Sequence, residues 1–76
     1  MPAEYPYERV TNELRRRIRT GIYKPGEKMP SRAQVAAEFG VSDIVVGTAM
    51  RTLKAEGLTE SLTGIGTFVA DPLPND

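Results

Sequence analysis

A glycine at position 40 lies between two segments that each begin with a signal for the start of a helix. Ser31 is followed three residues later by Gln34, the capping-box pattern, and Ser42 precedes a second run of helix-forming residues. Gly40 is suited to end the first helix sharply, because glycine adopts positive φ without steric cost. Two helices joined by a tight turn are therefore predicted, at 31–39 and 42–56.

The flanking segments add one helix and a strand pair. Upstream, apolar residues recur every three or four positions, the period of one helix face, which predicts a helix at 7–20. The residues of this pattern are Tyr7, Val10, Leu14, Ile18 and Ile22. Downstream, 58–62 and 66–70 are predicted to pair as strands around a turn at 63–65, and 28–29 is a candidate for a very short strand.

Three residues favour a helix-turn-helix over an ordinary helical hairpin. Ala36 allows close helix approach, Gly40 breaks the first helix, and Val46 is placed to be buried between the two helices. The inward face of the last helix is expected to carry Val46, Ala49, Met50 and Leu53. We expect a mainly α fold with a small β-hairpin (α+β), namely a winged helix-turn-helix of three helices and a two-stranded wing. This domain would cover 1–70, with 71–76 as a tail or the start of a linker.

The composition argues against catalysis and metal binding. The 76 residues include no cysteine and no histidine, which excludes disulfides, thiolate zinc sites and His-based acid–base chemistry. The segment 21–28 is close to a P-loop, but Glu27 stands where the lysine is required. We therefore expect no enzyme, no cofactor and no metal. No apolar run is long enough to span a bilayer and no signal peptide is evident, so a cytoplasmic, nucleoid-associated protein is expected.

The net charge of zero conceals an uneven distribution. Between positions 9 and 32 there are eight basic residues and two acidic ones. Such a segment attracts polyanions even when the protein as a whole is neutral. The alternative reading is a solvated helix face, and the arginines at 15, 16, 17 and 19 would then only keep the first helix soluble.

In this order, the motifs resemble the N-terminal winged-helix domain of the GntR family of bacterial transcription regulators. The matching segments are GIYKPG at 21–26, MPS at 29–31, VAAE at 35–38, GVS at 40–42, AMRTLKAEGL at 49–58 and GIGTFV at 64–69. The resemblance covers residues 7–70. It implies operator DNA as partner, dimerisation on a two-fold site, and a C-terminal ligand domain that is absent from these 76 residues.

The sequence departs from the family pattern at the DNA-reading positions. Where the family often has an acid and then an arginine after the serine of the second helix, this chain has Arg32 and Ala33. Where the family usually has arginine after the serine of the third helix, this chain has Asp43, and Gly47 stands near the second arginine position. The identity of the base contacts is therefore not carried over.

The candidate DNA contacts come from two helix starts, the exposed face of the third helix, and the wing tip. They are Ser31, Arg32, Ser42, Asp43, Ile44, Gly47, Thr48, Arg51, Thr63, Gly64, Ile65 and Thr67. Helix N-termini and Arg32 suit phosphates, and Ile44 suits a thymine methyl group. Asp43 suits cytosine N4 or serves only the helix dipole, and Gly47 allows close backbone approach to DNA. The wing either reaches DNA or merely completes the fold.

Taken together, these features predict sequence-specific binding of double-stranded DNA by part of a regulator, a repressor, with the helix at 42–56 in the major groove. The isolated domain is expected to be monomeric, and the full-length regulator to dimerise through the missing C-terminal region. No membrane contact is expected. The alternative is a winged helix used for protein–protein contact, which the missing arginines and the apolar pair at 44–45 favour.

Overall fold

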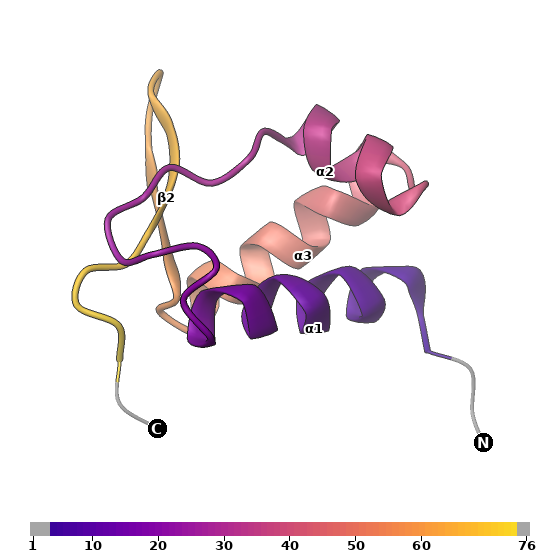
Figure 1. Cartoon of the computed structure of the whole chain (residues 1–76). Coiled ribbons are helices and arrows are strands. Elements are labelled where there is room, and N and C mark those ends of the chain that lie inside the picture. The colour runs from indigo at the N-terminus through magenta and orange to yellow at the C-terminus, as the bar shows by residue number, and fades with distance from the viewer. Residues whose placement is uncertain (1–3, 75–76) are drawn as a thin grey trace.

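The computed structural model describes residues 4–74, which form three helices followed by a hairpin. The elements in chain order are α1 (Pro6–Arg19), α2 (Arg32–Phe39), α3 (Asp43–Ala55), β1 (Thr59–Leu62) and β2 (Gly66–Val69). Figure 1 shows α1 lying beside α3, α2 beyond the other side of α3, and the wing standing at one end. The predicted winged helix-turn-helix architecture is therefore confirmed, with no boundary shifted by more than one residue.

The first helix begins earlier and ends earlier than predicted. Pro6, one residue before the predicted start, occupies the first helical turn, where its missing N–H is not needed. The Glu8 carboxylate accepts a hydrogen bond from the Tyr5 N–H at 3.0 Å and stabilises this start. The helix ends at Arg19, so Ile22 lies beyond it and is 54% exposed. The expectation that Ile22 continues the apolar face was therefore wrong.

The helix-turn-helix forms by the local signals predicted for it. The Ser31 hydroxyl accepts from the Gln34 N–H at 3.2 Å, and the Gln34 side chain accepts from the Ser31 N–H at 2.8 Å, which completes the capping box. Gly40 ends α2 in the left-handed region at φ 66°. The Ser42 hydroxyl then accepts from the Val45 N–H at 3.3 Å and caps α3.

The wing is an antiparallel hairpin joined by a third extended segment. Its register pairs Thr59 with Val69 at the base and Leu62 with Gly66 at the tip. Lys28 forms an isolated bridge to Phe68, which places the predicted short strand alongside β2. The backbone that leads into α2 is thus held against the wing (Figure 1).

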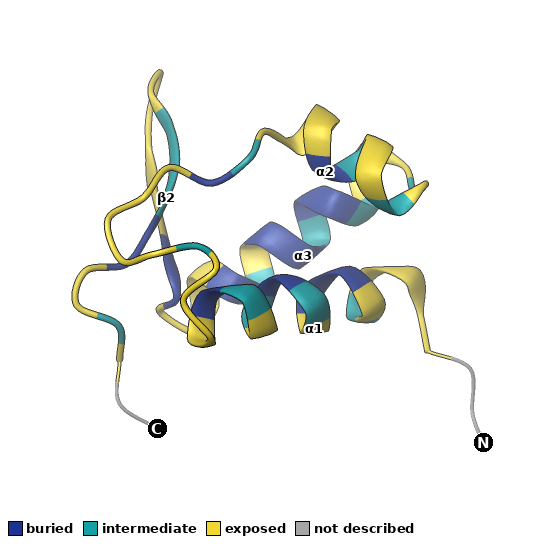
Figure 2. Ribbon diagram, in the orientation of Figure 1, coloured by how far each residue is buried: buried dark blue, intermediate teal, exposed yellow. Residues whose placement is uncertain are grey.

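The core lies between α1, α3 and the base of the wing. Figure 2 shows the buried faces of α1 and α3 turned toward each other, with the wing tip and the outer side of α2 exposed. All four residues predicted to face inward from α3 are buried, as are the central three of α1. The core residues are Val10, Leu14, Ile18, Met29, Val35, Val46, Ala49, Met50, Leu53, Leu58 and Val69. Leu73 packs against this core, whereas the last two residues of the predicted tail lie outside the described range.

Candidate nucleic-acid interface

A cleft of about 1010 Å³ separates the wing from the helix-turn-helix. Its walls come from α3, the start of α2, the extended segment before α2, and β2 with the wing turn. Four cationic side chains line it, namely Lys28, Arg32, Arg51 and Lys54. Glu27 is the acidic residue of the lining, so the cleft carries an excess of positive charge.

Three of these four cations have no ion pair within residues 4–74. They are Lys28, Arg51 and Lys54, whereas Arg32 lies 3.7 Å from the Asp43 carboxylate. Long cationic side chains that keep their charge toward solvent are available to a polyanion. The cleft therefore carries three cations without an ion pair in the described range, and two of them, Arg51 and Lys54, lie outside the basic segment 9–32.

Three arginines of α1, at positions 15, 16 and 17, are instead paired with glutamates. Arg15 pairs with Glu56 at the end of α3 at 2.6 Å, and Arg16 pairs with Glu13 at 2.7 Å. Hydrogen bonds from Arg16 and then from Arg17 lower the pKa of Glu13 to about 2. The hydrogen bond from Arg15 likewise lowers the pKa of Glu56. Arg15 thus links α1 to the end of α3, whereas Arg16 pairs within α1, and neither sequence interpretation of the basic segment included these roles.

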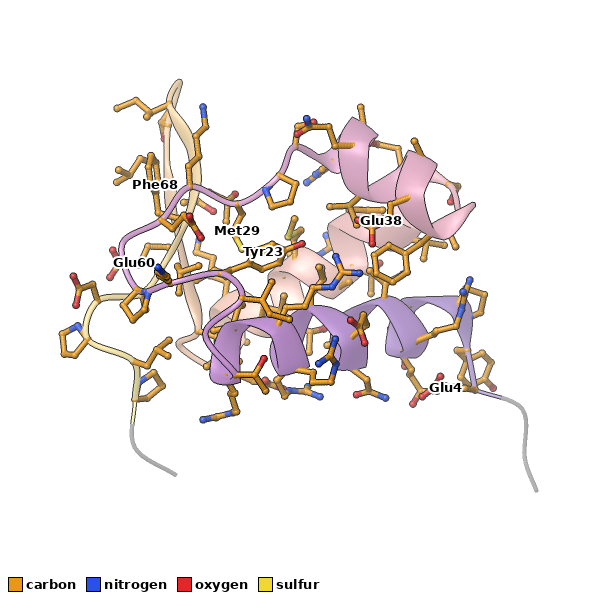
Figure 3. All side chains as sticks on the ribbon, viewed as in Figure 1. Glu4, Tyr23, Met29, Glu38, Glu60 and Phe68 are labelled. Carbon is orange, nitrogen blue, oxygen red and sulfur yellow. The ribbon has the colours of Figure 1, made fainter. Side chains whose placement is uncertain are left out.

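Arg17 joins three parts of the chain. Its guanidinium donates to Glu38 on α2, to the Tyr23 hydroxyl at 2.8 Å and to Glu13 at 2.8 Å. Figure 3 shows Tyr23 and Glu38 between α1 and α2, where this network lies. The guanidinium also lies over the Phe39 ring, 5.4 Å from its centroid. The hydrogen bonds to Glu38, Tyr23 and Glu13, in this order of effect, raise the pKa of Arg17. The network links α2 to α1 and to the loop that follows α1.

The start of α2 reaches onto the face of α3. Arg32 extends over Gly47, so that a Cβ built on Gly47 would lie 3.3 Å from the guanidinium carbon and from Nη1. Asp43, one turn before Gly47 on α3, is the ion-pair partner of the same guanidinium. Gly47 is buried although it lies on the outward side of the helix. From the sequence, the glycine at position 47 was interpreted as allowing close approach of the α3 backbone to DNA. In the structure, the Arg32 side chain lies against this position.

The remaining predicted contacts of α3 lie on its outward face. Ile44 is 80% exposed, the highest value among the large apolar residues of the described range. The Thr48 hydroxyl donates to the Ile44 carbonyl at 3.2 Å and lies within 3.5 Å of the Arg51 guanidinium. The exposed edge of α3 thus combines an apolar residue at its start with a cation further along.

The wing tip depends on two glycines. Gly64 adopts φ 79° in the turn, and the Ile65 N–H donates to the Leu62 carbonyl at 2.9 Å. Gly66 has φ 139°, and a Cβ there would lie 2.8 Å from Cε of Lys28. The second glycine therefore lets the Lys28 side chain cross the wing toward the cleft.

The structure divides the twelve predicted contact residues into two groups. Ser31, Arg32, Gly47, Arg51, Ile65 and Thr67 line the cleft. Ser42, Asp43, Ile44, Thr48, Thr63 and Gly64 lie at the start of α3 and at the wing tip, outside the lining. Sequence reasoning missed Lys28 and Lys54. Lys54 follows Gly47 by two turns on the same helix face, a spacing visible in the sequence, but the position of Lys28 depends on its pairing with β2.

Residues 4–74 contain no helix long and apolar enough to cross a membrane. In the same range, no group of three or more Asp, Glu, Cys or His side chains is placed to hold a metal ion.

The chain matches known regulators over nearly its whole length. Residues 6–69 match the family model described as bacterial regulatory proteins, gntR family. The histidine utilization repressor of Klebsiella aerogenes is 41% identical over 71 residues, covering 93% of this chain and 29% of the repressor. The mannosyl-D-glycerate transport/metabolism system repressor of Escherichia coli is 35% identical over 69 residues, covering 91% of this chain and 29% of that protein. The chain thus spans less than a third of either relative.

Solved structures agree with this assignment. A putative GntR-family transcriptional regulator superposes with a TM-score of 0.84 at 40% identity, covering 95% of this chain and 29% of that one. The DNA-binding domain of AraR, solved in complex with the operator ORE1, superposes with a TM-score of 0.86 at 34% identity. That match covers 90% of this chain and 83% of the AraR domain.

Proposed function

Because this chain belongs to the GntR family of bacterial regulatory proteins, we propose that it is the sequence-specific DNA-binding part of a transcriptional repressor. The observation that carries the proposal is the cleft between α3 and the wing, whose described lining carries four cationic side chains and one acidic one. A duplex that enters from this side meets cations from α2, α3 and the extended segment together. The operator complex of the similar AraR domain supports the same mode of use.

In this mode α3 lies in the major groove and the wing beside it. The free N–H groups at the starts of α2 and α3, next to Ser31 and Ser42, bind phosphates. Ile44 contacts a thymine methyl group, and Arg51 contacts a phosphate or a base edge. At the wing, the turn that includes Gly64 contacts the adjacent backbone or minor groove, together with Thr63, Ile65 and Thr67.

We further propose that the whole regulator extends beyond these residues, with a C-terminal effector domain through which it dimerises on a two-fold operator. The chain spans 29% of the first two curated relatives, which supports this proposal. Residues 71–76 then begin the linker to that domain. The protein acts in the cytoplasm at the nucleoid, and its relatives are transcriptional regulators rather than enzymes.

The test is a binding titration of the 76-residue chain with a fluorescent duplex from the region upstream of its own gene, repeated over a range of salt concentrations. Binding through the three unpaired cleft cations, Lys28, Arg51 and Lys54, is expected to weaken as salt is added. The slope of log K against log salt should be about −3, since each neutralised phosphate contributes about −0.9. A scrambled duplex of the same composition should bind more weakly.

A failure to bind either duplex at low salt would contradict the proposal. The protein-interaction alternative, for which the 80% exposed Ile44 is the favourable feature, would then explain the α3 surface.

A further inference from the structure

Arg32 is the first residue of α2, but its guanidinium lies on the surface of α3. It lies between two α3 residues that are one helical turn apart, within 3.7 Å of the Asp43 carboxylate and directly over Gly47. Its side chain remains 58% exposed. A cation is therefore present on the outward face of α3 although α3 itself has no basic residue before Arg51.

The contact with Gly47 is specific in its geometry. The guanidinium carbon and both terminal nitrogens lie 3.3–3.5 Å from the point where a Cβ of residue 47 would stand. The charged group thus lies next to the point at which a side chain of residue 47 would leave the helix. Glycine at this position lets the arginine lie against the α3 backbone.

Asp43 orients this group without occupying its hydrogen-bond donors. At 3.7 Å the carboxylate is too far for a hydrogen bond but close enough to attract the guanidinium. The N–H groups of Arg32 make no hydrogen bond to other described residues, so its planar fork stays available. A fork of this kind recognises the O6 and N7 atoms of guanine in the major groove.

We propose that Arg32 is the guanine-reading residue of this protein, held on the face of α3 by Asp43 and admitted there by Gly47. This inference rests on the proposed function, because it assigns the base reader of the same interface. Arg32 then determines sequence preference, rather than only anchoring a phosphate as its place at a helix start indicates. Asp43 is a positioning residue that acts through Arg32.

The experiment is selection of binding sites from a random duplex library by the 76-residue chain and its variants. The wild-type protein is expected to select sites with guanine at a defined position. Arg32→Ala is expected to lose the preference at that position, and Arg32→Lys to lose about tenfold in discrimination, because a lysine keeps the charge without the fork. Lys28→Ala is the matched control, which removes a cleft cation and should weaken affinity while the selected sequence stays unchanged.

Gly47→Ala tests the contact itself. The added methyl group forces the guanidinium to shift by a few tenths of an ångström, so guanine discrimination should fall about threefold, while Tm should not fall because alanine is the better helix former. In an Arg32→Ala background the same substitution should change discrimination by less than about twofold, because the group that it displaces is gone.

Three results would overturn the inference. Arg32→Ala and Lys28→Ala could lower affinity alike with the selected sequence unchanged, which would make Arg32 a phosphate contact. Gly47→Ala could impair binding equally in both backgrounds, which would indicate direct backbone approach to DNA. Selection of no preferred sequence by the wild-type chain would instead refute the proposed function, and the inference with it.

Discussion

At the scale of single residues, Thr59 combines burial with an unsatisfied polar atom. It lies at the start of β1, is 3% exposed, and its hydroxyl has no hydrogen-bond partner within the described range. A buried hydroxyl without a partner costs about 1–3 kcal/mol relative to its state in water. Valine has nearly the same shape without this cost.

We therefore expect Thr59→Val to raise the free energy of unfolding by about 1 kcal/mol, or Tm by about 4–8 °C in a domain of this size. Thermal unfolding followed by circular dichroism measures this. The control is Thr11→Val, since the equally buried Thr11 hydroxyl donates to the Tyr7 carbonyl at 2.6 Å. That variant should not gain stability, and a lower Tm for Thr59→Val would show that its hydroxyl has a partner in solution.

At the scale of elements, α2 is held in place largely by polar interactions at its start and on its surface. Helix α2 has eight residues and buries one of them, Val35, so it depends on its cap and on the Arg17 network more than on apolar packing. The capping box at Ser31 has both of its hydrogen bonds. Helix α2 also presents Arg32 to α3, so the guanine recognition proposed for Arg32 requires α2 to be stably folded.

Ser31→Ala is expected to lower the free energy of unfolding by about 1 kcal/mol, the usual cost of losing an N-cap. Ser31→Asp keeps a capping oxygen and should unfold at nearly the wild-type urea concentration. It also adds a negative charge beside the cleft, so its DNA affinity should fall although its stability does not. Equal loss of stability in both variants would mean that the hydroxyl does not cap α2.

Three glutamates that pair with arginines of α1 predict how the free energy of unfolding depends on pH. The folded-state pKa of Glu13 is lowered from 4.5 to about 2, and those of Glu38 and Glu56 are also lowered by their arginine partners. A carboxyl whose pKa is lowered by folding stabilises the protein above its unfolded-state pKa and loses this contribution as it becomes protonated. Stability should therefore decline as the pH falls from 4.5 toward about 2.

Glu13→Gln is expected to have a smaller decline in Tm over this interval than the wild-type chain, because one of the titrating groups is gone. The control is Glu60→Gln on the exposed side of β1, where no ion pair is present among residues 4–74. That variant should follow the wild-type pH profile. A Glu13→Gln profile identical to wild type would show that the pairs with Arg16 and Arg17 do not persist in solution.

At the scale of the whole molecule, one small core uses most of the large apolar side chains. The radius of gyration is 11.9 Å, close to the value of about 11 Å for a compact single chain of this length. The large apolar residues that stay exposed in the described range are distributed along the chain; they are Tyr5, Tyr7, Ile22, Ile44, Leu62 and Ile65. Because they come from the start of α1, the loop after it, α3 and the wing, we expect no single apolar surface as large as the one that a stable dimer buries.

The isolated chain is therefore expected to be monomeric at micromolar concentration. Sedimentation velocity should show a single species of about 8.3 kDa. Loading at a higher concentration should leave its sedimentation coefficient unchanged. A stable dimer would show that these residues hold an interface of their own, and dimerisation would then not require the C-terminal region.

The amino-acid sequence alone determined most of the elements, because their signals act over three or four residues. The caps at Ser31 and Ser42, the glycine at 40 and the period of α1 each depend on neighbours along the chain. The order of these signals also indicates the family. The end of α1 is predicted to within one residue, but the apolar spacing that includes Ile22 continues past the last helical turn, so Ile22 is exposed.

Only the tertiary structure decided which charges line the cleft. Arg15 meets Glu56 41 positions away, and Lys28 reaches the wing through its bridge to Phe68. The arginines at 15, 16 and 17 therefore pair with glutamates of the protein itself. The cleft takes its cations from the segment before α2, from α2 and from α3. Arg32 and Gly47 meet because α2 packs across α3. Such contacts depend on how the elements pack, which local sequence patterns do not encode. The sequence therefore marked Arg32 as a candidate DNA contact at the start of α2, but it did not show that the guanidinium lies on the face of α3.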